Sequence, residues 1–133
     1  MSVLVSGSIA IDNVKTQKAE QENLLGGSAS YAAIAASFFS PAHMVGVVGH
    51  DFPQEHLDLL KSREINLDGI EFSKGETFRW TGEYMDDMND RETLEVALNV
   101  LESWKPAVAD SQKGASINLL ANAHPQNQHE VID

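Results

Sequence analysis

Two adjacent glycines, Gly26 and Gly27, precede a run of small and apolar residues in the segment NLLGGSASYAAIAASFF. Glycine has no Cβ atom, so a Gly-Gly pair allows a ligand or another strand to approach the backbone closely. A glycine turn that leads into a helix also presents free N–H groups, which can bind an anion or a hydroxyl-rich ligand. Alternatively, the glycines only let the helix pack tightly against a sheet, and this segment alone leaves both interpretations open.

Four other polar side chains are candidates for ligand contacts. Asp12 directly follows an apolar run, and Asn122 and His124 lie at the end of another run, where ligands of α/β proteins bind. Arg79 lies on the polar side of an alternating segment, from which it could reach a ligand or simply contact solvent. The alternative role for Asp12 is that of a turn or cap residue, which is also the role expected of Asp51.

The composition limits the classes of partner. The 133 residues carry 9 Lys and Arg against 20 Asp and Glu, a formal net charge of -11 without a basic cluster, so we expect no nucleic-acid partner. The chain has no cysteine and its five histidines lack the spacing of metal ligands, so no metal site is expected. No signal peptide or membrane-length apolar run is present, which predicts one soluble cytoplasmic domain without a membrane partner.

Apolar runs predict alternating strands and helices. Three runs predict the buried strands of one sheet: Val3–Ile9, Met44–Val48 and Ile117–Ala121. Two further runs predict helices, a buried one from about Gly27 to Phe39 and a second one that starts near Pro53. The inner face of the second helix is expected to comprise Leu57, Leu59, Leu60 and Ile65. This order is typical of a parallel α/β sheet with right-handed crossovers.

The remaining segments predict a loop and a projecting flap. Residues 16–23 are polar and predict a loop, whereas residues 77–84 alternate as a half-exposed strand does. Arg91–Leu101 fits a strand or a helix, and a strand is favoured because the preceding strand needs a partner. The apolar stripe of this antiparallel flap consists of Phe78, Trp80 and Tyr84. A ligand, a partner chain or the domain itself must cover this stripe.

Five segments in this order resemble the N-terminal half of the PfkB, or ribokinase-like, carbohydrate kinases: VSGSIAID, GGSASY, GVVGHDFPQEHLDLLKSREINLDGI, TFRWTGEY and NLLANAHP. The resemblance covers essentially all of residues 1–133. It implies a Rossmann-like α/β domain, a parallel sheet with helices, that carries a small antiparallel β lid at about 77–101. It also implies ATP-dependent transfer of the γ-phosphoryl group, with Mg²⁺ arriving with the ATP, to a hydroxyl of a sugar or nucleoside.

The resemblance assigns roles to individual residues. Asp12 would accept hydrogen bonds from substrate hydroxyls, and Gly26 and Gly27 would let a sugar lie against the backbone, so this backbone suits a polyol rather than a phosphate. Tyr31 stands where the family usually has an asparagine, and it either stacks on the substrate or packs in the core. Glu64 stands where the family usually has a glycine, at the end of a surface helix.

The family's Asp-Thr-x-Gly-Ala-Gly-Asp segment, which supplies the anion hole and the aspartate base, does not occur in this sequence. We therefore expect no catalytic residue, no ATP or Mg²⁺ site and no kinase activity from this chain alone. Two functions stay open. The chain is either the substrate and lid part of a sugar or nucleoside kinase, ending before the C-terminal half, or a non-catalytic sugar-binding or dimerisation module. Self-association through the flap stripe and an open sheet edge is expected in both cases.

Overall fold

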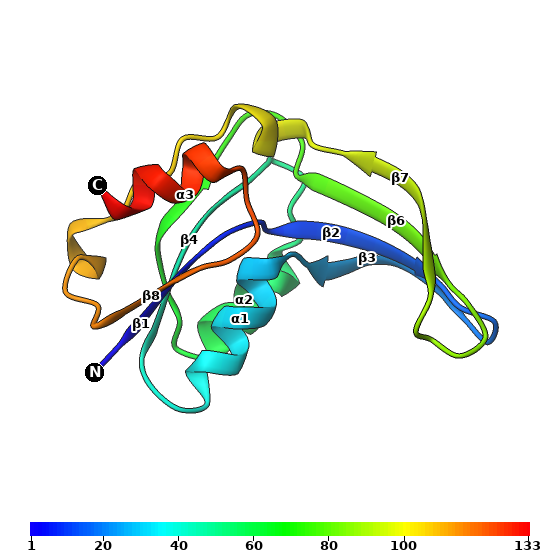
Figure 1. Cartoon of the computed structure of the whole chain (residues 1–133), viewed down its shortest axis with the longest axis horizontal. Coiled ribbons are helices and arrows are strands. Elements are labelled where there is room, and N and C mark those ends of the chain that lie inside the picture. Colours follow the sequence, from blue (N-terminus) through cyan, green and yellow to red (C-terminus); the bar gives the residue numbers. More distant parts are fainter.

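The computed structural model describes all 133 residues and contains two four-stranded sheets (Figure 1). The parallel core sheet has the order β5-β4-β1-β8, with β1 Val3–Ser6, β4 Ala42–Val48, β5 Asn66–Phe72 and β8 Ile117–Leu120. The second sheet, called the lid here, has the order β3-β2-β6-β7, with β2 Ala10–Lys15, β3 Glu20–Gly26, β6 Phe78–Tyr84 and β7 Arg91–Ala97. The helices are α1 Ser28–Ser37, α2 Gln54–Ser62 and α3 Pro125–Ile132, with short 3-10 turns η1 Asn99–Ser103 and η2 Asp110–Gln112.

The core sheet is covered on both faces. Helices α1 and α2 lie on one face, where small residues such as Ala29 and Ala33 let α1 approach the sheet, and Leu57 and Leu60 bring α2 against it. On the other face a smaller apolar cluster contains Trp104, and α3 lies over this side. Burial of both faces accounts for the continuous apolar character of β1 and β4. None of the helices has the length and apolar character needed to cross a lipid bilayer.

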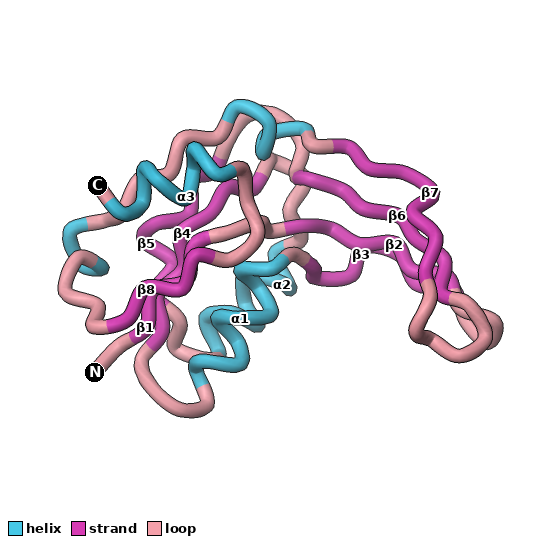
Figure 2. Tube along the Cα trace, in the orientation of Figure 1, coloured by secondary structure: helices cyan, strands magenta, loops and turns pink.

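The lid projects from the core as a curved sheet without helices (Figure 2). The flap expected from the sequence is confirmed, because β6 and β7 pair antiparallel. The lid is larger than that flap, however, since β2 pairs with β6 in parallel and with β3 antiparallel. The prediction of a loop over residues 16–23 is therefore wrong for its second part, because β3 begins at Glu20. This edge strand is exposed on both faces up to Leu24, so its polar side chains face water while its backbone pairs with β2.

The expected core strands are confirmed with changes in length. β1 pairs in parallel with both β4 and β8, as predicted. The expected strand Val3–Ile9 is too long, because β1 ends at Ser6. The packing is tight at the next residue, Gly7, where a Cβ atom would come within 2.8 Å of the Ser28 Oγ atom. The expected strand Arg91–Leu101 is also too long, since β7 ends at Ala97 and the next residues form η1, which buries Val100 in the core. The sequence analysis does not predict β5.

Both central helices differ from the expected burial. α1 begins at Ser28, close to the expected start, but Tyr31 is 66% exposed and Phe39, beyond the helix end, is 90% exposed. The expectation of a buried helix therefore holds only for one side, which contains Ala29, Ser30 and Ala33. In α2, Leu59 is 46% exposed, which corrects its assignment to the inner face. Two residues along a helix correspond to about 200° of rotation, so Leu59 points away from the side on which Leu57 packs.

The two leucines of α2 provide a test of this packing. We expect Leu60→Ala to lower the free energy of unfolding by about 2 to 5 kcal/mol, because it opens a cavity in the core. Leu59→Ala is the matched control and should change it by no more than about 0.5 kcal/mol. Urea denaturation followed by circular dichroism measures both values. Equal losses would contradict the orientation of α2.

Candidate functional site

The carboxylate of Asp12 lies on the lid, level with Trp80. The two residues are paired across the parallel strands β2 and β6, so their side chains point to the same face. On the other side the carboxylate lies against Gly26 of β3, and a Cβ atom at Gly26 would overlap it. Glycine is therefore required at this position for Asp12 to keep its orientation.

The carboxylate of Asp12 forms no hydrogen bond or ion pair within the chain. Burial raises the pKa of its carboxyl above the ordinary value of 3.8, and no hydrogen bond or neighbouring cation offsets this effect. A half-buried carboxylate without a partner destabilises the folded state. Its acceptor oxygens remain available to hydroxyl groups of a ligand.

Gly27 has a different role from Gly26. Its φ of 95° is in the region that favours glycine, and a Cβ atom there would overlap the backbone oxygen of Ser8. At the start of α1, the Ser28 N–H donates to the Ser8 Oγ at 3.0 Å and the Ala29 N–H donates to the Ser8 carbonyl at 2.9 Å. Of the two interpretations of this glycine turn, the contacts of Gly27 support tight packing rather than anion binding.

Ser8 also connects the glycine turn to the end of β8. The carbonyl of Asn122 accepts hydrogen bonds from the Ser28 hydroxyl at 3.0 Å and from the Ser8 N–H at 3.2 Å. A pocket of about 670 Å³ lies at this position, at the carboxyl ends of β1 and β8. Its wall includes Asn122, His124 and, from the lid, Phe78. Phe78 is on the same face of β6 as Trp80, so the pocket and Asp12 share one side of the lid.

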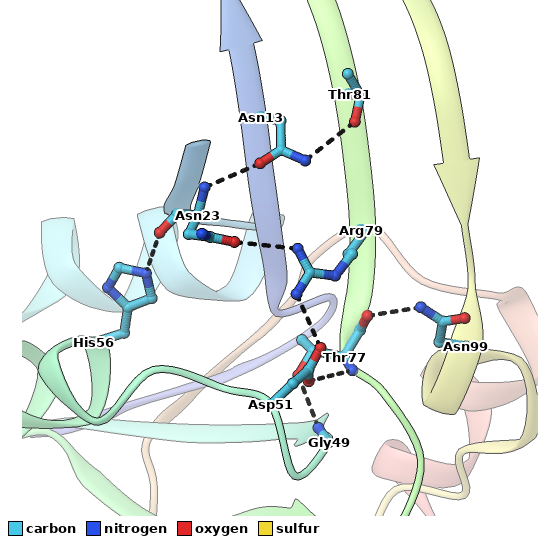
Figure 3. Close-up of polar contacts among 9 residues, drawn as sticks. All are labelled: Asn13, Asn23, Gly49, Asp51, His56, Thr77, Arg79, Thr81 and Asn99. Atoms are coloured by element: carbon cyan, nitrogen blue, oxygen red, sulfur yellow. Dashed lines mark hydrogen bonds and ion pairs between the residues drawn. The ribbon is translucent and has the colours of Figure 1, made fainter. Parts of the chain in front are cut away.

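Tyr31 and Arg79, the other two predicted residues, do not line this pocket. Tyr31 is exposed on the first turn of α1, so core packing is excluded, and its side chain has no hydrogen bond. Arg79 is paired with Ile11 and points to the lid face opposite to Asp12. There it contacts Asp51 and Asn23 (Figure 3). Asp51 lies in a turn, as expected, and the N-cap of α2 is Pro53 instead.

Comparisons with known proteins find only structural similarity. No protein-family model and no curated protein matches the chain. A nucleoside kinase from Methanocaldococcus jannaschii, an archaeal member of the ribokinase family, matches with a TM-score of 0.71 and 16% identity over 98% of this chain and 47% of its own. Ribokinase from Cryptococcus neoformans in complex with ADP matches with a TM-score of 0.68 and 18% identity over 89% of this chain and 40% of its own. A nucleoside kinase from Burkholderia thailandensis in complex with inosine matches with a TM-score of 0.64 and 20% identity over 76% of this chain and 38% of its own.

The chain has the ribokinase fold. The structure confirms the α/β fold class expected from the sequence, with a parallel sheet, helices and a β lid. The chain spans less than half the length of these structures, between 38% and 47%. The similarity therefore establishes the architecture in which Asp12, Gly26 and the pocket lie, and their roles stay predictions.

The groups at the glycine turn and along the pocket wall do not favour the phosphates of ATP. The first N–H groups of α1 already bond to Ser8, so the helix start offers no cradle for phosphates. Lys105 lines the pocket together with the acidic Glu102 and Glu130, which oppose a polyphosphate. No group of three His, Cys, Asp or Glu side chains lies close enough to hold a metal ion.

The unpaired carboxylate predicts a pH-dependent difference in stability. The folded-state pKa of Asp12 is raised, so protonation stabilises the fold, and this stability is lost as the pH rises through that pKa. At pH 7 we therefore expect Asp12→Asn to melt at a higher temperature than the parent chain. The difference should shrink as the pH falls toward 3.8, and calorimetry or circular dichroism can follow it. A lower melting temperature of the variant at pH 7 would show that the carboxylate has a stabilising partner.

Proposed function

We propose that the chain binds a sugar or nucleoside, with Asp12 accepting hydrogen bonds from the hydroxyls and Gly26 keeping the carboxylate accessible. The observation that carries this proposal is the half-buried carboxylate without a partner, on the lid face that leads to the pocket. An ionised carboxylate only accepts hydrogen bonds, so it favours hydroxyl groups over phosphates. The net charge of -11 adds to this preference for an uncharged ligand.

The ribokinase fold supports the same ligand class. One of the matched structures contains inosine, a nucleoside, and another contains ADP. We propose accordingly that the chain acts as the substrate and lid part of an ATP-dependent kinase. In that reaction a substrate oxygen forms a bond to the γ-phosphorus, the bond between this phosphorus and ADP breaks, and the hydroxyl proton passes to a base. None of the residues proposed for ligand binding, namely Asp12, Gly26, Asn122 and His124, is assigned a step in this transfer.

We keep a second candidate function, a non-catalytic sugar-binding or dimerisation module, because both candidates predict no ATP site among these residues. Both candidates share the ligand site and differ in whether phosphoryl transfer takes place in the assembled protein. For this chain alone, mixed with Mg·ATP and either D-ribose or inosine, we propose that no ADP forms, because charge stabilisation at the γ-phosphate is missing. ADP formation that depends on the acceptor would contradict this proposal and exclude the module.

Ligand binding can be tested by calorimetry with D-ribose and inosine. Asp12→Ala should weaken binding by about 10- to 100-fold, because hydrogen bonds to a charged group contribute about 1.5 to 3 kcal/mol each. Gly26→Ala should also weaken it, since the new Cβ atom displaces the carboxylate. Asp58→Ala, which removes an exposed carboxylate from α2, is the matched control and should bind like the parent. Unchanged affinity in Asp12→Ala would refute the proposed site.

We also propose that the chain self-associates. β8 is an edge strand of the core sheet, and its side chains Ile117 and Leu119 are 48% and 45% exposed. The lid adds the half-buried stripe of Phe78, Trp80 and Tyr84. Such an open edge and apolar surface favour pairing between copies.

Light scattering over a concentration series should show a mass above the 14.5 kDa of one chain. A charge on the open edge, as in Leu119→Lys, should shift the equilibrium toward the monomer, because pairing would then bury an unpaired ammonium group. Glu71→Lys changes an exposed residue on the opposite edge strand and serves as the control. A parent chain that stays monomeric at high micromolar concentration would contradict self-association.

A further inference from the structure

A polar cluster joins the lid to the core (Figure 3). It lies on the lid face opposite to Asp12. We call it the lid anchor, and it consists of Asn23, Asp51, His56, Thr77 and Arg79. Asn23 belongs to β3, Thr77 directly precedes β6 and Arg79 belongs to it. The other two residues come from the core segment between β4 and the end of α2. The cluster is therefore the polar connection between two lid strands and the core.

Asp51 forms the centre of the lid anchor. One carboxylate oxygen accepts hydrogen bonds from the Thr77 N–H at 2.8 Å and the Thr77 hydroxyl at 2.7 Å. The other oxygen pairs with the Arg79 guanidinium at 3.0 Å, and the two side chains are only 17% and 32% exposed. Partial burial raises the pKa of Asp51, but the hydrogen bonds from Thr77 and Arg79 and the charge of Arg79 outweigh this and hold the pKa below its ordinary value. Unlike Asp12, this carboxylate has a partner for each oxygen.

Asn23 connects the anchor to the other neighbour of β2. Its φ of 58° coincides with a register shift between β2 and β3, so β3 is bent at this residue. In this conformation the Asn23 side-chain oxygen accepts from Arg79 at 3.2 Å, and its backbone oxygen accepts from the His56 Nε2 atom at 2.8 Å. His56 itself is buried and contacts Phe52 edge-on, with ring centroids 5.6 Å apart. The bend thus fastens β3 to α2.

The anchor residues flank Asp12 on both sides. β2 lies between β3 and β6, and Asp12 is paired with Leu24 on one strand and Trp80 on the other. Each of these partners follows directly after an anchor residue, Asn23 and Arg79. A shift of either neighbouring strand must therefore move the Asp12 carboxylate relative to the pocket.

We propose that Asp51 is a positioning residue for the ligand site, which sets the angle of the lid through Arg79 and Asn23 and so holds Asp12 toward the pocket. The effect on ligand affinity rests on the proposed function, whereas the effect on the lid does not. Asp51 itself lies on the opposite side of the lid from the ligand. A purely structural role would instead lower the stability of the core and the lid together.

Amide hydrogen exchange of the ligand-free chain tests the lid directly. Asp51→Asn keeps an acceptor for Thr77 but removes the charge that holds Arg79. We expect exchange in β2, β3 and β6 to become about tenfold faster while β1 and β4 keep the parent's rates. Asp58→Asn changes the net charge by the same amount on the exposed side of α2 and should leave amide exchange in both sheets unchanged. Unchanged lid exchange in Asp51→Asn, or an equal increase in both sheets, would overturn the proposal.

Two variants of Arg79 refine this test. Arg79→Lys retains a cation for Asp51 and should preserve most of the lid protection, whereas Arg79→Met retains only the apolar stem and should lose it. The double variant Asp51→Asn with Arg79→Met should exchange no faster than the faster single variant, because both remove one interaction. Fully additive effects would contradict a shared anchor.

Titration with D-ribose and inosine then tests positioning. We expect Asp51→Asn to bind the ligand about tenfold more weakly than the parent, and Asp58→Asn to bind equally well. Parent affinity in Asp51→Asn, despite a loosened lid, would overturn the positioning role. If the parent chain binds neither compound, the proposed function fails, while the exchange experiment still decides whether Asp51 controls the lid.

Discussion

The passage of the chain from the core sheet to the lid is the constraint on which the rest of the structure depends. It occupies only residues 7–9, between the end of β1 and the start of β2, and Ser8 lies at its centre. Through its hydroxyl, its N–H and its carbonyl, Ser8 bonds to the start of α1 and to the end of β8. Neighbouring elements come so close here that Gly7 and Gly27 leave no room for a Cβ atom. The start of the lid, the helix start and the pocket are consequently fixed relative to one another.

Two carboxylates near this junction show how surroundings give the same chemical group different roles. Asp12 and Asp51 lie on opposite faces of the lid, and their pKa values shift in opposite directions. Asp51 accepts hydrogen bonds from Thr77 and pairs with the Arg79 guanidinium, so its charge stabilises the folded chain. Asp12 has neither kind of partner, so its charge destabilises the folded chain. The Asp12 carboxylate, which has no partner inside the molecule, is free to accept hydrogen bonds from outside it. The Asp51 carboxylate on the opposite face of the lid stabilises the fold and offsets part of the free energy that the unpaired Asp12 costs.

The sequence predicts the parts of the fold that follow local rules. The parallel strands β4 and β8, the start of α1 at the glycine turn and the flap strand β6 all have clear apolar patterns. It does not predict β3, because an exposed edge strand with the residues Glu20–Asn23 has the composition of a loop, and only pairing with β2 makes it a strand. Similarly, the sequence alone does not show which side of α2 packs against the core sheet. Helical periodicity excludes Leu59 from the core only when that side is known.

The candidate site is predictable to a lesser degree. Asp12 and Gly26 are identified through the family resemblance, and the structure brings them into contact, while their role in binding stays a prediction. The partner of Arg79 could not be predicted, because Asp51 lies 28 residues away and nothing in the local sequence indicates the pairing. Asn23 gives a weak signal, since asparagine tolerates a positive φ more readily than most residues.

In the proposed function, recognition by a residue on a strand rather than on a loop has a consequence for selectivity. Asp12 is on β2, whose two neighbours are both fastened to the core, whereas Asn122 and His124 lie on the segment after β8. A ligand that spans both parts meets a carboxylate whose orientation is fixed by backbone pairing, so little conformational entropy is lost there on binding. In the proposed function, the pocket wall, which includes Asn122 and His124, is the part that distinguishes the ligand beyond its hydroxyl groups. Selectivity for a sugar over a nucleoside is therefore expected to depend on the pocket wall rather than on the lid.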